Sequence, residues 1–204
     1  DFRQWCFTEE EAPELKGKWR SEVFKVEESY PLDLEIGTGN GYHFAHHAEK
    51  YPKRCFVGIE LKYKPLIQAI RRAVSRGCEN AKILRYNARL LKDLFAPNEL
   101  DTVFIHFPDP WSKKKQWKHR LIQDQFLDEL YELQRPGSLL EFKTDNRDYF
   151  DWAFEKFKNS KYEILGYSYD LHHSEFAEQN FVTGFEQIFL NKGLKINYII
   201  LKKS

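Results

Sequence analysis

Three glycines stand at every second position, Gly37, Gly39 and Gly41, directly after an apolar segment that ends at Ile36. Because glycine has no Cβ, such a turn can bend sharply and bring its backbone close to a ligand. In an open α/β sheet, ligands bind where a strand ends in this kind of turn. A dinucleotide fingerprint would also need glycine at position 42, where Tyr42 stands, and this weakens a nicotinamide or flavin interpretation. From this motif alone, a ligand turn and a purely structural turn both stay open.

Polar side chains follow at the points where an adenosine-bearing ligand would need them. Glu60 lies 19 positions after Gly41, at the end of a predicted strand, where a carboxylate can accept hydrogen bonds from both ribose hydroxyls. Asn87, just beyond the next predicted strand, offers an amide to adenine. Each of these residues alone would also suit an ordinary strand end or turn. Glu35 interrupts an apolar strand and needs a partner, either a ligand's ammonium group or a nearby lysine.

The most informative segment begins at Asp109, which lies between two prolines directly after a predicted buried strand. The prolines hold its backbone stiffly. The following stretch, 111–120, contains five lysines and arginines, two tryptophans and no acidic residue. Basic side chains contact phosphates, and aromatic rings stack on exposed bases, so this stretch favours a nucleic-acid partner over a merely solvated helix start.

Two later motifs are predicted at the same edge. Asp145 follows another predicted strand, and Thr183-Gly184-Phe185-Glu186 precedes the last one. Each motif alone is explained as a cap or a loop. Together with Asp109 they would place three carboxylates near one another, facing the basic stretch.

The histidines do not form a recognisable metal site. His43 and His47 are four positions apart on a predicted helix, but they lack the glutamate and the third ligand of a zinc protease motif, so we interpret them as surface residues. The pair His172-His173 has no cysteine or acidic framework around it. No nucleophile elbow or phosphate-binding Walker loop occurs, so the sequence does not indicate a hydrolase or a kinase.

Composition narrows the class of protein. The 204 residues carry a formal net charge of +1, so a nucleic-acid partner would have to be met by a local patch. The three cysteines contain no C-x-x-C pair and predict reduced thiols in a cytoplasmic protein. We expect no membrane span and no signal peptide. The chain has no methionine, so we expect an amino-terminal piece to be missing.

The predicted elements alternate between strand and helix. Strands are expected at 32–36, 54–60, 81–84, 101–107, 138–142, 162–169 and 196–201, and helices at 42–51, 65–77, 119–134 and 146–158, with no clear helix between the last two strands. This order predicts an α/β fold, a Rossmann-like doubly wound, mostly parallel seven-stranded sheet with an antiparallel last strand. Residues 1–30 are expected to form an irregular arm or cap, and residues 31–204 a single domain.

Nearly the whole chain resembles the tRNA (guanine-N7-)-methyltransferases, a family of class I S-adenosylmethionine-dependent enzymes. The resemblance rests on the glycine turn with Glu35, on Gly58-Ile59-Glu60, on Pro108-Asp109-Pro110-Trp111 with its lysines, on Phe142 to Asn146, and on Thr183 to Glu186. The tryptophan and lysine segment is its most specific part. Asn87 stands where the family commonly has aspartate, and Ser112 where proline is frequent.

The resemblance assigns roles by position. It implies an S-adenosylmethionine site at Glu35, Gly37, Gly39, Glu60, Asn87 and Asp109, with Asp109 also catalytic. It implies substrate contacts at Lys113, Asp145, Thr183, Gly184, Phe185 and Glu186. We expect weaker RNA contacts from Lys114, Lys115, Lys118 and Arg120.

The expected reaction is methyl transfer to N7 of a guanine in the variable loop of tRNA, without a metal, by a monomer or a homodimer. Guanine N7 has a free lone pair, so no base must first remove a proton. Asp109 is expected to orient the guanine and to stabilise the positive charge that develops on it. The alternatives are a methyltransferase that acts on a protein or small molecule, a dinucleotide oxidoreductase, and an RNA-binding module without catalysis.

Overall fold

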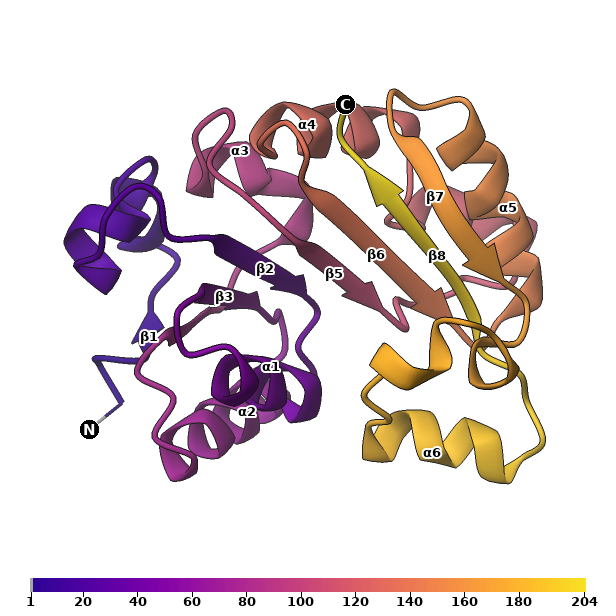
Figure 1. Ribbon diagram of the computed structural model, residues 1–204, viewed down its shortest axis with the longest axis horizontal. Coiled ribbons are helices and arrows are strands. Elements are labelled where there is room, and N and C mark those ends of the chain that lie inside the picture. The colour runs from indigo at the N-terminus through magenta and orange to yellow at the C-terminus, as the bar shows by residue number, and fades with distance from the viewer. Residues whose placement is uncertain (1) are drawn as a thin grey trace. The chain divides into compact units, whose positions relative to one another are not determined.

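The computed structural model describes residues 2–204 and has an α/β fold with an eight-stranded, mostly parallel sheet (Figure 1). By its internal contacts the chain divides into two compact units. The first comprises Asp1–Phe104 with Glu132–Arg135, and the second comprises Ile105–Tyr131 with Pro136–Ser204. The chain passes from the first unit to the second within β5 (Val103–His106). That residues 31–204 act as one domain stays a prediction.

The first unit is built on a parallel sheet in the order β1-β4-β3-β2. The five residues of β2 and the five of β3 are all buried, as expected for central strands of a parallel sheet. The strands are β1 (Cys6–Phe7), β2 (Leu32–Ile36), β3 (Cys55–Ile59) and β4 (Ala81–Leu84), and the helices are α1 (Tyr42–Lys50), α2 (Tyr63–Ser75) and α3 (Leu91–Leu94), with 3-10 turns at Ala12–Leu15 and Ala88–Leu90.

Helices α1 and α2 lie side by side against the sheet of the first unit (Figure 1). Their apolar faces form one cluster with the strands, in which Phe44 of α1 stacks on Phe56 of β3 with ring centres 5.0 Å apart. The two helices approach closely at Gly41. A Cβ built there would lie 2.5 Å from the Cα and 2.6 Å from the Cβ of Ala69.

We expect Gly41→Ala to destabilise the protein more than Gly77→Ala. Both glycines have a positive φ, +75° and +66°, but a Cβ at Gly77 would meet nothing within 4 Å. Gly77→Ala should therefore cost only the backbone strain, about 1–3 kcal/mol, whereas Gly41→Ala must also push α1 and α2 apart. Urea unfolding of the two variants measures the difference. Equal losses would contradict a tight contact between the helices.

Residues 2–30 are more ordered than the predicted irregular arm. Cys6 and Phe7 pair with Ile83 and Leu84, and they add the eighth strand that the sequence did not predict. A π-helical turn, Trp19–Phe24, follows. Trp19 is fully buried, and its indole nitrogen donates to the carbonyl of Leu94 at 2.8 Å. The tryptophan therefore anchors this segment on the first unit.

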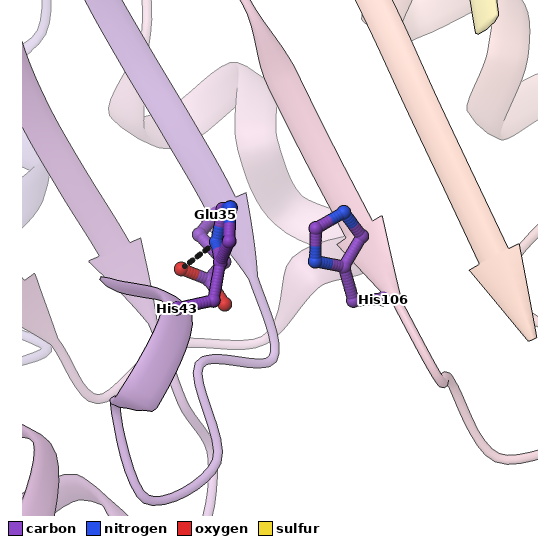
Figure 2. Close-up of side chains that lie close together, drawn as sticks. All are labelled: Glu35, His43 and His106. Carbon is purple, nitrogen blue, oxygen red and sulfur yellow. Dashed lines mark hydrogen bonds and ion pairs between the residues drawn. The ribbon is translucent and has the colours of Figure 1, made fainter. Parts of the chain in front are cut away.

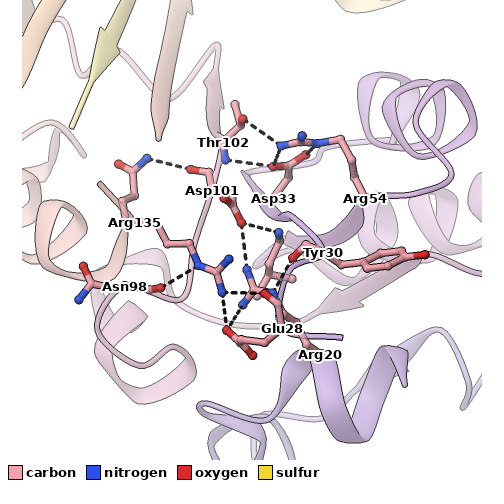
Figure 3. Close-up of polar contacts among 11 residues, drawn as sticks. Arg20, Glu28, Tyr30, Asp33, Arg54, Asn98, Asp101, Thr102 and Arg135 are labelled. Atoms are coloured by element: carbon pink, nitrogen blue, oxygen red, sulfur yellow. Dashed lines mark hydrogen bonds and ion pairs between the residues drawn. The ribbon is translucent and has the colours of Figure 1, made fainter. Parts of the chain in front are cut away.

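A buried aspartate, Asp33, and a partly buried one, Asp101, organise the beginning of β2, at the end of the strand away from the glycine turn (Figure 3). Asp33 is fully buried and accepts two hydrogen bonds from Arg54, both at 2.6 Å, one from His47 at 3.0 Å and one from the backbone N–H of Thr102 at 3.0 Å. Asp101 accepts from Arg20 at 2.9 Å. Burial alone would raise the pKa of the Asp33 carboxyl, but the hydrogen bonds from Arg54 and His47 and the charge of Arg54 hold it below its usual range.

This pKa shift predicts how stability changes in acid. The pKa of Asp33 in the folded protein lies below its value of about 3.9 in the unfolded chain. The stability that the ionised carboxylate contributes is therefore fully present above about pH 3.9, and it is lost as pH falls through the folded pKa. We expect Asp33→Asn to be less stable than wild type at pH 7 and to lose less further stability below pH 4. Urea unfolding from pH 7 to pH 2 measures both. Asp93→Asn, an exposed acid of the same unit, is the control, and an unchanged acid profile in Asp33→Asn would contradict the assignment.

The second unit carries β6 (Leu139–Thr144), β7 (Glu163–Ser168) and β8 (Asn197–Lys202) in the order β6-β8-β7. β8 runs antiparallel to both neighbours, which confirms the predicted antiparallel last strand. The helices are α4 (Asp124–Leu133), which ends in the first unit, α5 (Arg147–Lys158) and α6 (Gly184–Asn191), with 3-10 turns at Lys114–His119, Leu171–His173 and Ala177–Gln179.

One predicted boundary in this unit was wrong, and one helix was not predicted. The helix expected at 119–134 begins only at Asp124, because residues 114–119 form a 3-10 turn. The side chain of Gln123 donates to the carbonyls of Trp117 and Arg120, which separates turn from helix. Helix α6 was not expected at all.

None of the helices in the described part of the chain has the length and apolar content that a membrane crossing needs.

Candidate functional site

The glycine turn of the first unit leaves open space beside its backbone. Gly37 and Gly39 have φ values of +78° and +53°, and a Cβ built on either would meet nothing within 4 Å. The N–H groups of Gly37 and Thr38 both donate to the carbonyl of Ile59, at 2.8 and 3.2 Å, so the turn is fixed to the end of β3. The turn is therefore rigid on its β3 side and accessible on the other.

Glu60 ties the end of β3 to the same turn. One carboxylate oxygen accepts from the N–H of Gly39 at 2.9 Å, and the other accepts from the N–H of Lys62 at 2.9 Å. The side chain is half-buried. A carboxylate has about four acceptor positions, so Glu60 keeps capacity for hydroxyl donors of a ligand while its orientation is fixed.

Thr38, within the turn, is a residue that the sequence analysis did not single out. Its hydroxyl is buried and has no hydrogen-bond partner among the described residues. Buried polar atoms are normally satisfied, so this oxygen fits a site where a polar ligand group completes the hydrogen bond. Gly58 makes room for Thr38, because a Cβ at Gly58 would lie 2.6 Å from the threonine methyl and 2.8 Å from the ring of Phe44. Close packing thus comes from β3, which explains why Tyr42 can replace a third glycine.

The partner of Glu35 is a histidine, not a lysine. Figure 2 shows the His43 ring of α1 directed at this carboxylate, with Nδ1 3.0 Å from Oε2. Only 11% of the His43 side chain is exposed, and the same value holds for His47, which binds Asp33. The prediction that both are surface histidines was wrong: four-residue spacing places them on the buried face of α1, where each contacts a carboxylate of β2.

Asn87 is exposed, and its side chain accepts from the N–H of Arg89 at 3.0 Å, as the cap of the turn at 88–90.

In the second unit, the loop after β5 has an unusual backbone. Phe107 and Trp111 have positive φ values of +52° and +44°, which bulky residues rarely adopt. Asp109 lies midway between them, flanked by Pro108 and Pro110, and it is exposed. Strained backbone of this kind persists only where its surroundings hold it, and it gathers at functional sites.

The basic stretch divides into an exposed part and a buried residue. Lys113, Lys114, Lys115 and Lys118 are exposed, and Trp111 is 36% exposed with its ring 5.2 Å from that of His119. Arg120 is fully buried. RNA cannot reach its side chain in this structure, so the prediction of an RNA contact at Arg120 was wrong. The residue ends the 3-10 turn with its side chain directed inward, which a count of basic residues cannot reveal.

Glu186 is the second predicted contact residue that the structure places in the interior. Its side chain is fully buried, and Lys143 of β6 donates to it at 2.7 Å. Asn180 and His172 lie 2.8 and 2.9 Å from its other oxygen. A base cannot contact this carboxylate directly in the structure. Glu186 instead fixes α6 to the end of β6, where Figure 1 also places the helix.

The other predicted substrate residues lie at the start of α6 and at the end of β6. Thr183 caps α6, accepting from the N–H of Glu186 at 3.1 Å, while Gly184 and Phe185 are exposed. The Phe185 ring packs edge-on against Phe107 at 5.6 Å, so α6 contacts the strained loop. Asp145 follows β6, and burial raises the pKa of its carboxyl.

Comparison with known proteins assigns the chain to a family. A family model described as "Putative methyltransferase" matches residues 29–199. The tRNA (guanine-N(7)-)-methyltransferase of Bdellovibrio bacteriovorus is 51% identical over 203 residues, which cover 100% of this chain and 97% of that protein. The chain belongs to the tRNA (guanine-N7-)-methyltransferase family.

Further comparisons agree with this membership. The tRNA (guanine-N(7)-)-methyltransferase of Clostridium novyi is 34% identical over 95% of this chain and 89% of that protein. Among solved structures, a SAM-dependent methyltransferase from Aquifex aeolicus superposes with a TM-score of 0.59 at 12% identity, over 96% of this chain and 98% of that one. At this identity the likeness shows the fold alone. As a tRNA (guanine-N7-)-methyltransferase, the protein uses S-adenosylmethionine, and the open glycine turn, the oriented Glu60 and the unsatisfied Thr38 hydroxyl fit that cofactor.

Proposed function

We propose that the protein transfers the methyl group of S-adenosylmethionine to N7 of a guanine in the variable loop of tRNA. The observation that carries this proposal is the exposed Asp109 in a stiffly held loop, followed directly by four exposed lysines and an exposed tryptophan. The name and the 51% identity of the Bdellovibrio bacteriovorus relative support the same reaction.

The first unit would hold the cofactor. S-adenosylmethionine, when bound, supplies an electrophilic methyl group on its sulfonium sulfur. Gly37 and Gly39 give backbone access, Glu60 accepts from ribose hydroxyls, and Asn87 turns its amide to adenine. Glu35 would contact the cofactor from an orientation that His43 fixes, since His43 Nδ1 lies 3.0 Å from Glu35 Oε2.

The second unit would hold the guanine and the RNA. N7 attacks the methyl carbon with its own lone pair as the carbon–sulfur bond breaks, and the purine gains the positive charge that the sulfur loses. The residues must therefore place the base and stabilise that charge. Asp109 does both through the N–H edge of guanine. The base would be surrounded by Asp145, Thr183, Gly184 and the exposed ring of Phe185. Glu186 is left out of this set, because its carboxylate is held by Lys143 in the interior.

The exposed lysines would bind the RNA backbone. Lys113 lies nearest Asp109 in the sequence and would contact the target nucleotide's phosphate, and Lys114, Lys115 and Lys118 would contact neighbouring phosphates. The base edge must be reached, so the target guanine is expected in a loop or extruded from its stack. We propose a cytoplasmic enzyme that needs no metal and acts as a monomer or a homodimer.

The test is incubation with methyl-labelled S-adenosylmethionine and unmodified tRNA, followed by nucleoside analysis. Label in 7-methylguanosine is the expected result. Label in another nucleoside would contradict the proposed base placement. Cofactor binding without any transfer to RNA would favour a protein or small-molecule acceptor.

A further inference from the structure

Arg120 is among the largest fully buried side chains of the described chain. Its guanidinium lies against three aromatic rings, with its central carbon 4.5 Å from the ring centre of Trp117, 4.9 Å from that of Tyr149 and 5.0 Å from that of Trp152. A guanidinium is weakly hydrated and planar, so it suits such an aromatic environment better than an ammonium group does.

From this position Arg120 reaches the loop that carries Asp109. Its Nε donates to the carbonyl of Pro110 at 2.9 Å. That carbonyl belongs to the peptide bond between Pro110 and Trp111, so the hydrogen bond fixes the backbone where φ becomes +44°. Nine residues, 111–119, all polar or aromatic and mostly exposed, lie between the two ends of this contact.

The other end of the loop is fixed independently. The N–H of Phe107, where φ is +52°, donates to the carbonyl of Lys143 at 2.8 Å. Asp109 lies between these two fixed points. Asp109 is exposed, and the direction of its side chain depends on the hydrogen bonds on both sides of it.

We propose that Arg120 is a positioning residue for methyl transfer: by holding the Pro110 carbonyl it sets the direction of the Asp109 carboxylate and of the Trp111 ring. This inference rests on the proposed function, because it takes Asp109 to be the residue that meets the guanine. A carboxylate that must support an in-line transfer loses much of its effect when it is displaced by about 1 Å.

The rival explanation is that Arg120 only fills the interior. Replacing a buried charge by an apolar side chain of similar length is often neutral or stabilising, so Arg120→Met separates the two roles. We expect Arg120→Met to keep a thermal unfolding midpoint close to that of wild type. Its kcat should fall by about 10- to 100-fold, with an unchanged KM for S-adenosylmethionine. The kcat of Arg120→Lys should lie between those of wild type and Arg120→Met, because a lysine can still donate to the Pro110 carbonyl but lacks the planar guanidinium.

Hydrogen–deuterium exchange gives a readout that does not depend on activity. In Arg120→Met, the amides of residues 116 and 120, which donate to the carbonyls of Lys113 and Trp117 in wild type, should exchange faster, whereas those of β6 and β8 should be unchanged. Lys156→Met is the matched control. Lys156 reaches the same Trp152 ring from α5, with its Nζ 5.7 Å from the ring centre, and pairs with Asp124 at 2.6 Å. This variant should match wild type in kcat and in exchange of the loop.

Two results would overturn the proposal. One is Arg120→Met with wild-type kcat and wild-type loop exchange; the other is a general rise in exchange with a lowered unfolding midpoint, which means a purely structural role. If Arg120→Met does not fold, the same two readouts on Arg120→Lys decide. If the wild-type protein makes no 7-methylguanosine, the proposed function fails. The positioning contact is tested separately: it is rejected if the loop of Arg120→Met exchanges at the wild-type rate.

Discussion

Asp109→Asn is expected to lower kcat for 7-methylguanosine formation by about 10²–10³-fold at saturating tRNA. Asparagine keeps the size of the side chain and one acceptor oxygen, but it removes the negative charge that opposes the positive charge on the methylated purine. Asp109 is exposed, so the substitution leaves no buried group unsatisfied, and the unfolding midpoint should not move. Single-turnover measurements with excess enzyme report the chemical step directly.

The control for this prediction is Asp151→Asn. Asp151 is an exposed aspartate of the same unit that pairs with Arg147 on α5 at 2.9 Å. It should retain wild-type turnover. If Asp109→Asn also turned over at the wild-type rate with saturating tRNA, Asp109 would not stabilise charge in the transition state. A raised KM for tRNA with unchanged kcat would limit Asp109 to binding.

Lys143→Met is expected to lower the free energy of unfolding by about 3–5 kcal/mol. Lys143 and Glu186 are 1% and 0% exposed, with their charged atoms 2.7 Å apart. Removing the ammonium leaves the Glu186 carboxylate in the interior, with the side chains of Asn180 and His172 as its remaining side-chain partners among the described residues. Urea unfolding at pH 7 measures the loss.

The double variant Lys143→Met/Glu186→Gln makes this prediction specific. Removing the orphaned charge should restore part of the stability lost in the single variant, so the two changes should not be additive. Lys195→Met is the control, because Lys195 is 70% exposed and pairs with Asp170 at the surface, and it should change stability little. Additive losses in the double variant would show that Lys143 and Glu186 do not act as a pair.

The elements with strong periodicity were predictable from the sequence. The strand at 81–84 and the helix beginning at Tyr42 occur as predicted, because each has apolar residues at the period of its own structure. Helix α6 is the opposite case, because it was not predicted. Its apolar residues Phe185, Ile188 and Phe189 do recur at helical spacing, but the helix spans only eight residues and its buried residue is the charged Glu186, so the pattern was too short to indicate a helix.

The site was predictable to the level of residue type and chain position, but not of burial. The turn glycines and Glu60 could be recognised because their roles depend on local backbone geometry. Arg120 and Glu186 could not be assigned correctly, since a charged residue is placed inside or outside by partners that are distant in the sequence. For Glu186 that partner is Lys143, which lies 43 positions earlier. The pairing of His43 with Glu35 was missed for a different reason: the two residues are only eight positions apart, but their contact depends on how α1 packs against β2.

The two-residue strand β1 forms the edge of the sheet of the first unit. Its backbone covers the side of β4 that would otherwise end the sheet of the first unit, with Ile83 donating to the carbonyl of Trp5 at 2.8 Å. Ala81, Ile83 and Leu84 are all buried, so an uncovered β4 would present an apolar strand with free hydrogen-bonding groups. Such edges pair with other chains and lead to aggregation, whereas a very short edge strand offers them almost nothing to extend. Removal of Cys6 and Phe7 is therefore expected to promote association between copies of the chain through β4.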